Sequence, residues 1–206
     1  MVAGFWVLEG MDGSGKSTQA ELLVAELEKA GRRPLHLREP GSTGLGEGLR
    51  KMLLDRNREV WDPRSEALLF FAARSELLRS QVAPALADGR DVVCERFTPS
   101  TVAYQGQGGL ADWVLELDRL VVSPELQPHG VFILDLEPAV SFARVGGDDG
   151  HDGFESRGLG FQEKVREGYL AYASANPDRT ALIAAEGLSI EEISFQILQA
   201  VEARRQ

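Results

Sequence analysis

The feature that most constrains this chain is residues 5–18, which read FWVLEGMDGSGKST. The short apolar run FWVLE is followed by a glycine-rich turn and then by residues with helical spacing. Gly10, Gly13 and Gly15 allow backbone N–H groups to curl around an anion, and the start of the helix adds partial positive charge. A strand, a phosphate-binding turn and a helix in this order predict an α/β fold that begins with a P-loop.

The P-loop spacing predicts that the residues of the turn bind the phosphates of a nucleoside triphosphate. Lys16 is expected to reach the β and γ phosphates, and the hydroxyl of Ser17 is placed for Mg²⁺. The predicted phosphate-binding residues are Gly10, Met11, Asp12, Gly13, Ser14, Gly15, Lys16, Ser17 and Thr18. The alternative is an ordinary glycine-rich turn, but the spacing and both flanking elements favour a P-loop.

Strand and helix signals alternate along the rest of the chain. Further apolar runs read PLHLRE, DVVCE, VFILDL and TALIAA, and helical patterns fill the gaps between them. We expect helices at 17–30, around 46–54, at 63–86 and at 190–204. This order predicts a three-layer α/β/α arrangement with a five-stranded parallel sheet, covered on both faces. We expect one domain, 1–206, because neither a linker nor a repeat interrupts the pattern.

Composition restricts the partners. A net charge of -10 argues against extended contact with nucleic acid, which needs a basic surface. No apolar run approaches the length of a membrane span, and the first residues lack the charged region of a signal peptide. The single cysteine, Cys94, excludes an internal disulfide and fits a reducing compartment. We therefore expect a soluble cytoplasmic protein.

A P-loop alone leaves GTPases, ATPases and small-molecule kinases open. Guanine-specific switches normally carry an Asn/Thr-Lys-x-Asp element, and the chain lacks it. The segment CERFTPSTVAYQGQGG, 94–109, begins at the carboxyl end of a predicted strand, where open α/β sheets bind ligands. Glu95 and Arg96 are therefore expected to face a site.

Residues 94–109 resemble the thymidylate (dTMP) kinase family, in which Asp-Arg-Tyr/Phe is followed by Ser-Ser/Thr-x-Ala-Tyr-Gln-Gly. The resemblance extends in order to LREPGSTGLGEGLRKMLLD, ALLFFAARSELL and KVREGYLAYA, over nearly the whole chain. It implies a nucleoside-monophosphate-kinase fold with a flexible lid at about 146–160. It also implies transfer of the ATP γ-phosphoryl group to dTMP with Mg²⁺, by a homodimer.

The matching motif positions imply how the thymine base is read. Phe70 would stack on the ring, with Arg74 and Gln105 hydrogen-bonding its edge. Tyr104 would pack near C2′ and disfavour a ribose hydroxyl, and Thr101 would line the base pocket. Phe70 and Arg74 are four residues apart, so they share one face of a helix.

The same resemblance implies the residues that hold the sugar and phosphate of the acceptor. Arg50 and Arg96 would bind the acceptor phosphate, with Asp12 and Glu39 near its sugar and the metal. Taken alone, arginines such as Arg50 and Arg74 would be read as solvated helix faces, and it is the agreement of several segments that favours a binding role.

The chain departs from the family at the arginine that stabilises the moving phosphoryl group. Some relatives carry it in the P-loop, at the position of Gly13, and others in a lid element, Asp-Arg-x-Glu, at the position of Gly153. We expect Arg157 to take this role, since it lies one turn beyond Gly153 if the segment is helical. Arg144 is the second candidate.

Glu95 is a further departure, because the family usually carries Asp there. We expect Glu95 and Ser17 to hold the metal. We expect Lys16, Arg96, Glu95 and Arg157 to form the catalytic set.

Two alternative functions stay open. Glu95-Arg96 is also similar to the Glu-Arg of deoxynucleoside kinases, and the missing arginines would fit a degenerate relative that binds nucleotide with little turnover.

Overall fold

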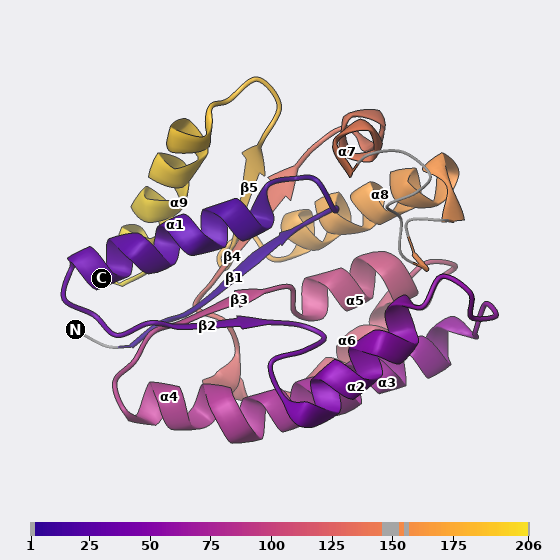
Figure 1. The fold of residues 1–206 in the computed structure, drawn as a ribbon, viewed down its shortest axis with the longest axis horizontal. Coiled ribbons are helices and arrows are strands. Elements are labelled where there is room, and N and C mark those ends of the chain that lie inside the picture. The colour runs from indigo at the N-terminus through magenta and orange to yellow at the C-terminus, as the bar shows by residue number, and fades with distance from the viewer. Residues whose placement is uncertain (1–2, 146–152, 155–156, 206) are drawn as a thin grey trace.

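The computed structural model describes residues 3–145, 153–154 and 157–205. In this part of the chain, a sheet of five parallel strands lies between two layers of helices, with the strand order β2-β3-β1-β4-β5 (Figure 1). The strands are β1 Phe5–Gly10, β2 Leu35–Arg38, β3 Val92–Glu95, β4 Gly130–Asp135 and β5 Thr180–Ala184. The predicted parallel sheet is confirmed.

Helices α1 and α9 cover one face of the sheet, and the remaining helices lie on the opposite face or at its end (Figure 1). The helices are α1 Lys16–Lys29, α2 Gly44–Leu54, α3 Pro63–Leu77, α4 Ala83–Ala87, α5 Thr98–Gln105, α6 Ala111–Val121, α7 Pro138–Val145, α8 Leu159–Ala175 and α9 Ile190–Arg204. Two short turns join them, a π-helix at Leu78–Val82 and a 3₁₀-helix at Pro124–Leu126. None of the helices in the described ranges is long and apolar enough to cross a membrane.

The central strand shows why both faces must be covered. Trp6 and Leu8 pack in the cluster formed with α1 and α9, whereas Phe5 and Val7 pack in the cluster on the opposite face. All four side chains are fully buried. Because successive side chains of a strand point to opposite faces, a continuous apolar run requires helices on both sides.

The helix expected at 63–86 is interrupted. Helix α3 ends at Leu77, and the N–H of Ala83 donates to the carbonyl of Leu78, five residues back. Pro84 follows directly, has no N–H to donate and crowds the carbonyl four residues before it. The wider π turn accommodates this proline. The other expected helices agree with the structure to within two residues at each end.

The carboxyl ends of the three strands β1, β2 and β3 meet at one edge of the sheet. Glu95 pairs in register with Leu8 on one side and with Arg38 on the other. The P-loop, the loop after β2 and Arg96 therefore emerge next to one another. Both chain termini lie at the opposite edge (Figure 1).

Candidate active site

The P-loop backbone is shaped to receive an anion. Gly13 and Gly15 have φ angles of 78° and 93°, a left-handed region that favours glycine. A Cβ on Gly10 would lie 2.7 Å from the carbonyl oxygen of Leu134, so this position requires glycine as well. Helix α1 has neither a side-chain cap nor an acidic residue in its first turn. Its N-terminal N–H groups therefore point to where a phosphate would bind.

Asp12 joins two cations at the P-loop. Its Oδ1 atom lies 2.5 Å from Nζ of Lys16 and 2.7 Å from Nη2 of Arg96. Burial acts to raise the pKa of the Asp12 carboxyl, but Arg96 and Lys16 together outweigh it and hold that pKa well below its usual range. Burial also lowers the pKa of Lys16. A local excess of positive charge thus stands at this point of an acidic protein.

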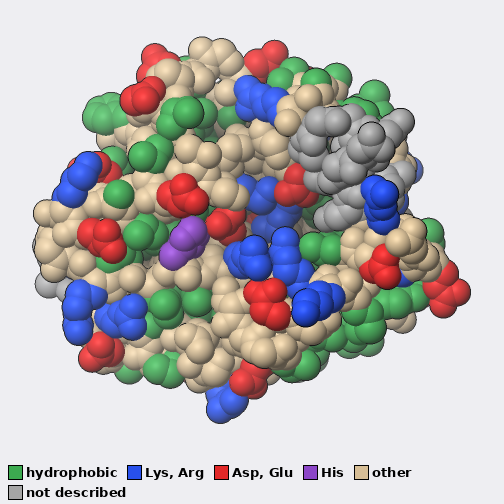
Figure 2. All heavy atoms as spheres, viewed as in Figure 1, with side chains coloured by type: hydrophobic (Ala, Val, Ile, Leu, Met, Phe, Trp, Pro, Cys, Tyr) green, Lys and Arg blue, Asp and Glu red, His purple; other side chains and the backbone are tan. Residues whose placement is uncertain are grey.

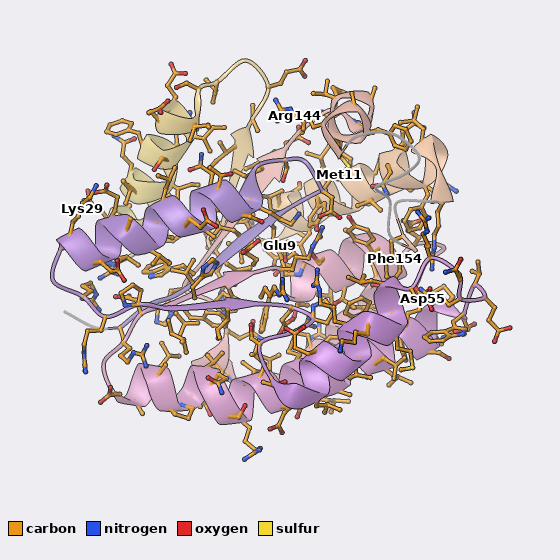
Figure 3. All side chains as sticks on the ribbon, viewed as in Figure 1. Glu9, Met11, Lys29, Asp55, Arg144 and Phe154 are labelled. Atoms are coloured by element: carbon orange, nitrogen blue, oxygen red, sulfur yellow. The ribbon has the colours of Figure 1, made fainter. Side chains whose placement is uncertain are left out.

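Arg96 is held in an unusual backbone conformation by a buried carboxylate. Its φ angle is 68°, which a residue with a side chain rarely adopts. Glu9, fully buried at the centre of Figure 3, accepts from the N–H of Phe97 at 2.7 Å and from the hydroxyl of Ser100 at 2.6 Å. Helix α5 has no side-chain cap from its own N-cap residue, Phe97. Glu9 supplies that cap from β1, and it fixes the turn that presents Arg96.

The pocket next to the P-loop contains every residue predicted for the acceptor. Its lining consists of Asp12, Glu39, Pro40, Arg50, Leu54, Phe70, Arg74, Arg96, Phe97, Ser100, Thr101, Tyr104, Gln105 and Phe154. Figure 2 shows Lys and Arg side chains gathered beside acidic ones at the centre of the face between α1 and α2. Residues from the P-loop, from the loops after β2 and β3, and from α2, α3 and α5 therefore converge on one site.

Arg74 is the most deeply buried cation of this pocket, with 1% of its surface exposed. Its Nε atom donates to Glu39 Oε2 at 2.8 Å, and its Nη2 atom donates to Thr101 Oγ1 at 3.1 Å. The guanidinium group lies over the rings of Phe71 and Phe97, at 4.6 and 4.7 Å. Among the described residues, nothing pairs with Arg74 Nη1 or with Glu39 Oε1, although both atoms are buried. Arg74 therefore keeps a donor for a ligand.

Phe70 and Phe71 have different surroundings, a distinction that the sequence left open. Phe71 is buried in a core cluster, whereas Phe70 is half-buried and lines the pocket. The ring of Phe70 lies 6.0 Å from that of Phe154, and Tyr104 meets Phe154 edge-on at 5.9 Å. Phe70 is thus the phenylalanine that is available to a ligand.

Arg50 reaches the pocket from α2. Its Nη1 atom donates to the carbonyl of Pro40 at 3.0 Å, in the loop that begins with the cis peptide bond between Glu39 and Pro40. Burial lowers the pKa of Arg50, and Arg38 lowers it further. An anion in the pocket would relieve this repulsion between cations.

Ser17 and Glu95 meet where a metal would be expected. The hydroxyl of Ser17 donates to Glu95 Oε2 in a short contact, and Glu95 Oε1 lies 3.1 Å from Nε2 of His36. Burial raises the pKa of Glu95, but the hydrogen bonds from His36 and Ser17 outweigh it and leave that pKa lowered. The described residues contain no cluster of three metal-binding side chains. One carboxylate and one hydroxyl nevertheless fit Mg²⁺, which binds through few protein ligands and the phosphates of its substrate.

Comparisons with known proteins find similar sequences and structures over most of the chain. The thymidylate kinase family profile matches residues 8–197. Thymidylate kinase of Dinoroseobacter shibae is 44% identical over 178 residues, covering 85% of each chain. Thymidylate kinase of a Synechococcus strain is 42% identical over 202 residues, covering 97% of this chain and 95% of its own. The crystal structure of thymidylate kinase from Ehrlichia chaffeensis superposes with a TM-score of 0.77 at 30% identity, covering 98% of this chain and 99% of that one.

The chain belongs to the thymidylate kinase family. The match spans the P-loop, the pocket beside it and the first half of α9, so the resemblance seen in the sequence is confirmed. The α/β fold expected from the alternation of strands and helices is the fold of this family.

The lid predicted for this chain, at about 146–160, lies largely outside the described residues. Gly153 and Phe154 are described. Gly153 contacts the end of α2, and Phe154 lies near Asp55 (Figure 3). The N–H of Gly153 donates to Leu54 O at 3.2 Å, and a Cβ on Gly153 would lie 3.0 Å from Asp55 O. A side chain such as that of arginine at this position would require the end of α2 to move slightly.

The structure separates the two arginines considered for the missing catalytic charge. Arg157 Nη2 lies 2.5 Å from Glu66 Oε1, and its guanidinium group stacks on Phe154 at 4.6 Å. Arg144 instead contacts the P-loop, since its Nη1 atom donates to the carbonyl of Gly13 at 3.3 Å. Arg144 and the P-loop residue Met11 lie near the same end of the sheet (Figure 3). A catalytic role for Arg157 stays a prediction.

Four residues of the site do not follow from the motifs. They are Glu9, Glu66, Phe154 and Tyr169. Two of them carry a sequence signal. Glu9 is a carboxylate in an apolar strand, and Glu66 precedes Phe70 and Arg74 at helical spacing. The hydroxyl of Tyr169 lies 3.1 Å from Arg96 Nη1. Tyr169 belongs to the family-like segment KVREGYLAYA, but no spacing assigned it to the site, because α8 meets α5 only in the folded chain.

Proposed function

We propose that this protein transfers the γ-phosphoryl group of ATP to dTMP, giving dTDP and ADP. The observation that carries the proposal is the position of the acceptor pocket beside the P-loop. Asp12 lines that pocket and also pairs with Lys16, so the acceptor and donor sites share one residue. Family membership supports the same reaction.

The acceptor base is held between apolar surfaces and read at its edge. Phe70 offers a ring for stacking, and Leu54 and Phe154 add apolar contact. The Nη1 donor of Arg74 suits a carbonyl oxygen such as O4 of thymine. An aromatic ring for stacking beside a guanidinium group in a fixed orientation is a common arrangement for recognising a planar base.

The chemistry requires positioning and charge neutralisation. Arg50 and Arg96 hold the phosphate of dTMP, one oxygen of which bonds to the γ phosphorus while the bond to the β–γ bridging oxygen breaks. That attacking oxygen is already anionic, so the reaction needs no strong general base. Lys16 and the N-terminus of α1 hold the donor phosphates. Ser17 and Glu95 would hold Mg²⁺, which when bound neutralises charge on the donor phosphates.

The charge that other thymidylate kinases supply with an arginine is provided here by Arg144, by Arg157 or by both. Contact between Arg144 and Gly13 supports Arg144 directly. Support for Arg157 is its place within the segment that the family resemblance identifies as the lid, at about 146–160. The two residues are distinguished by kinetics, as set out in the Discussion.

We also propose that the protein is a cytoplasmic homodimer. Exposed apolar side chains occur on α2, α3 and α6, at Met52, Leu68 and Leu120. Helix α3 contacts both α2 and α6, so these helices form one connected surface. Sedimentation at micromolar concentration tests the dimer, and a monomer at that concentration would contradict it.

The acceptor assignment is tested by calorimetry with a panel of monophosphates. We expect dTMP to bind best, dUMP next, and dGMP and AMP weakly, because the pocket holds one planar pyrimidine. The methyl group of thymine contributes only about 1–3 kcal/mol in an apolar pocket. Equal affinity for the purine monophosphates would contradict a thymidylate acceptor.

A further inference from the structure

Glu66 is a fully buried carboxylate beside the acceptor pocket, on α3. Its Oε1 atom accepts from Arg58 Nη2 at 2.7 Å and from Arg157 Nη2 at 2.5 Å. Its Oε2 atom accepts from Nε2 of Gln105 at 3.1 Å. The two carboxylate oxygens therefore have different partners, two arginines for one and a side-chain amide for the other.

These contacts determine which way the amide of Gln105 faces. A carboxylate paired with two guanidinium groups only accepts hydrogen bonds, so Gln105 must turn its NH₂ group toward it. The carbonyl oxygen Oε1 of Gln105 is left for the pocket, which this side chain lines while being 1% exposed. Within the described ranges, no residue donates a hydrogen bond to this oxygen.

We propose that Glu66 is a specificity-determining residue that selects bases with a proton on N3. By fixing the Gln105 amide, it makes the pocket present a carbonyl acceptor, which pairs with N3–H of thymine or uracil. The N3 atom of cytosine is itself an acceptor and would face that carbonyl without a proton between them. This inference rests on the proposed function, because it names how the same acceptor site rejects a cytosine nucleotide.

A second carboxylate fixes the neighbouring base-reading group in the same way. Glu39 holds Nε and Nη2 of Arg74, which leaves the Nη1 donor for the ligand. The pocket thus offers one donor and one acceptor. Thymine and uracil offer the complement, O4 and N3–H, whereas cytosine offers an amino group and a bare nitrogen. Cytosine is therefore mismatched at both positions.

The helix spacing brings these groups together. Glu66, Phe70 and Arg74 follow one another at intervals of four residues on α3. They share one face of the helix, which turns toward α5 and its residues Thr101 and Gln105. A stacking ring, a donor and the residue that orients the acceptor are therefore carried by a single helix.

The test compares dUMP with dCMP, since neither base carries the methyl group and the two differ only at the edge in question. Calorimetry on the full chain is expected to show strong preference for dUMP. In Glu66→Gln, the new amide can donate as well as accept, so Gln105 is free to turn over. We expect the ratio of the two affinities to fall by roughly 10- to 100-fold.

Two further variants keep the test decisive. Arg58→Gln removes an ion pair from the same carboxylate but leaves its contact with Gln105, so the affinity ratio is expected to persist. Gln105→Leu removes the acceptor itself and is expected to lower the ratio as Glu66→Gln does, even if the latter folds poorly. An unchanged ratio in Gln105→Leu, or an equal loss in Arg58→Gln, overturns the inference.

The outcomes also distinguish this inference from the proposed function. If the unaltered protein binds dTMP but does not distinguish dUMP from dCMP, Glu66 has no selective role and the kinase assignment stands. If the protein binds no pyrimidine monophosphate at all, the proposed function itself is contradicted.

Discussion

Asp12 both lines the proposed acceptor pocket and pairs with the P-loop lysine, Lys16. It pairs with Lys16 at 2.5 Å and with Arg96 at 2.7 Å, in a protein whose net charge is -10. Phosphates arriving on either side would compete with its carboxylate for the same two cations. One carboxylate against two cations leaves a positive charge at this point, which favours a phosphate although the protein as a whole is acidic.

Arg144 and Arg157 are predicted to have different kinetic effects. Arg144 contacts the P-loop, so Arg144→Ala is expected to lower kcat with little change in the KM for dTMP. A phosphoryl-transfer arginine contributes about 10³–10⁵ in rate, and an exposed one is expected at the lower end. Arg157→Ala removes a contact to Glu66, so it is expected to raise that KM as well. Steady-state kinetics of both variants measures this, and unchanged kcat in both would contradict a catalytic arginine.

Glu39 is predicted to make stability depend on pH. Burial raises its pKa to about 7, although Arg74 acts to lower it. Because this value lies above the ordinary pKa of 4.5, the unfolded chain loses the proton first as pH rises. The stability contributed by Glu39 therefore falls between pH 4.5 and pH 7 and is constant above that range.

The measurement is urea unfolding of the unaltered protein and of Glu39→Gln at several pH values. The free energy of unfolding of the former, relative to the variant, should decline from pH 5 to pH 7, by at most about 1.4 kcal/mol per unit. A difference that stays flat or rises over this interval contradicts the raised pKa.

The N-terminal cap of helix α5 comes from a residue that is distant in the sequence. It carries Thr101, Tyr104 and Gln105 into the pocket, and its first turn is capped by Glu9 of β1. Glu9→Ala would leave the N–H groups of Phe97 and Ser100 buried without an acceptor. We expect a loss of about 3 kcal/mol in the free energy of unfolding, together with weaker dTMP binding through Arg96.

A control for this variant is Glu28→Ala, at an exposed position on α1. Its effect on the free energy of unfolding is expected to stay within about 0.5 kcal/mol. If Glu9→Ala costs no more than Glu28→Ala in urea unfolding, the capping role of Glu9 is wrong.

The elements that the sequence predicts well are those with strong local signals. Strands such as β1 and β4 are apolar runs between helical patterns, and their burial on both faces follows from that pattern. The π turn at Leu78–Val82 and the cap of α5 were not predicted. Both depend on contacts made in the folded chain, one around Pro84 and one with Glu9, 88 residues before Phe97.

Across the whole molecule, the predicted acceptor residues converge because their motifs follow the carboxyl ends of adjacent parallel strands or lie on the helices beside them. Motif positions therefore predicted nine of the residues that line the pocket, although their roles toward a ligand stay predictions. They did not predict what orients that lining. Glu66 and Glu39 act through buried partners, and the packing of Phe154 on α2 and α3 is a tertiary contact without local spacing.

The most direct test of the account is the stoichiometric formation of dTDP and ADP from ATP and dTMP, followed by chromatography. We predict one ADP for each dTDP, and loss of turnover without loss of fold in Lys16→Ala, because we propose that Lys16 holds the donor phosphates. If the protein binds both nucleotides in calorimetry but forms no dTDP, the missing arginines have abolished catalysis and the account of a working kinase is contradicted.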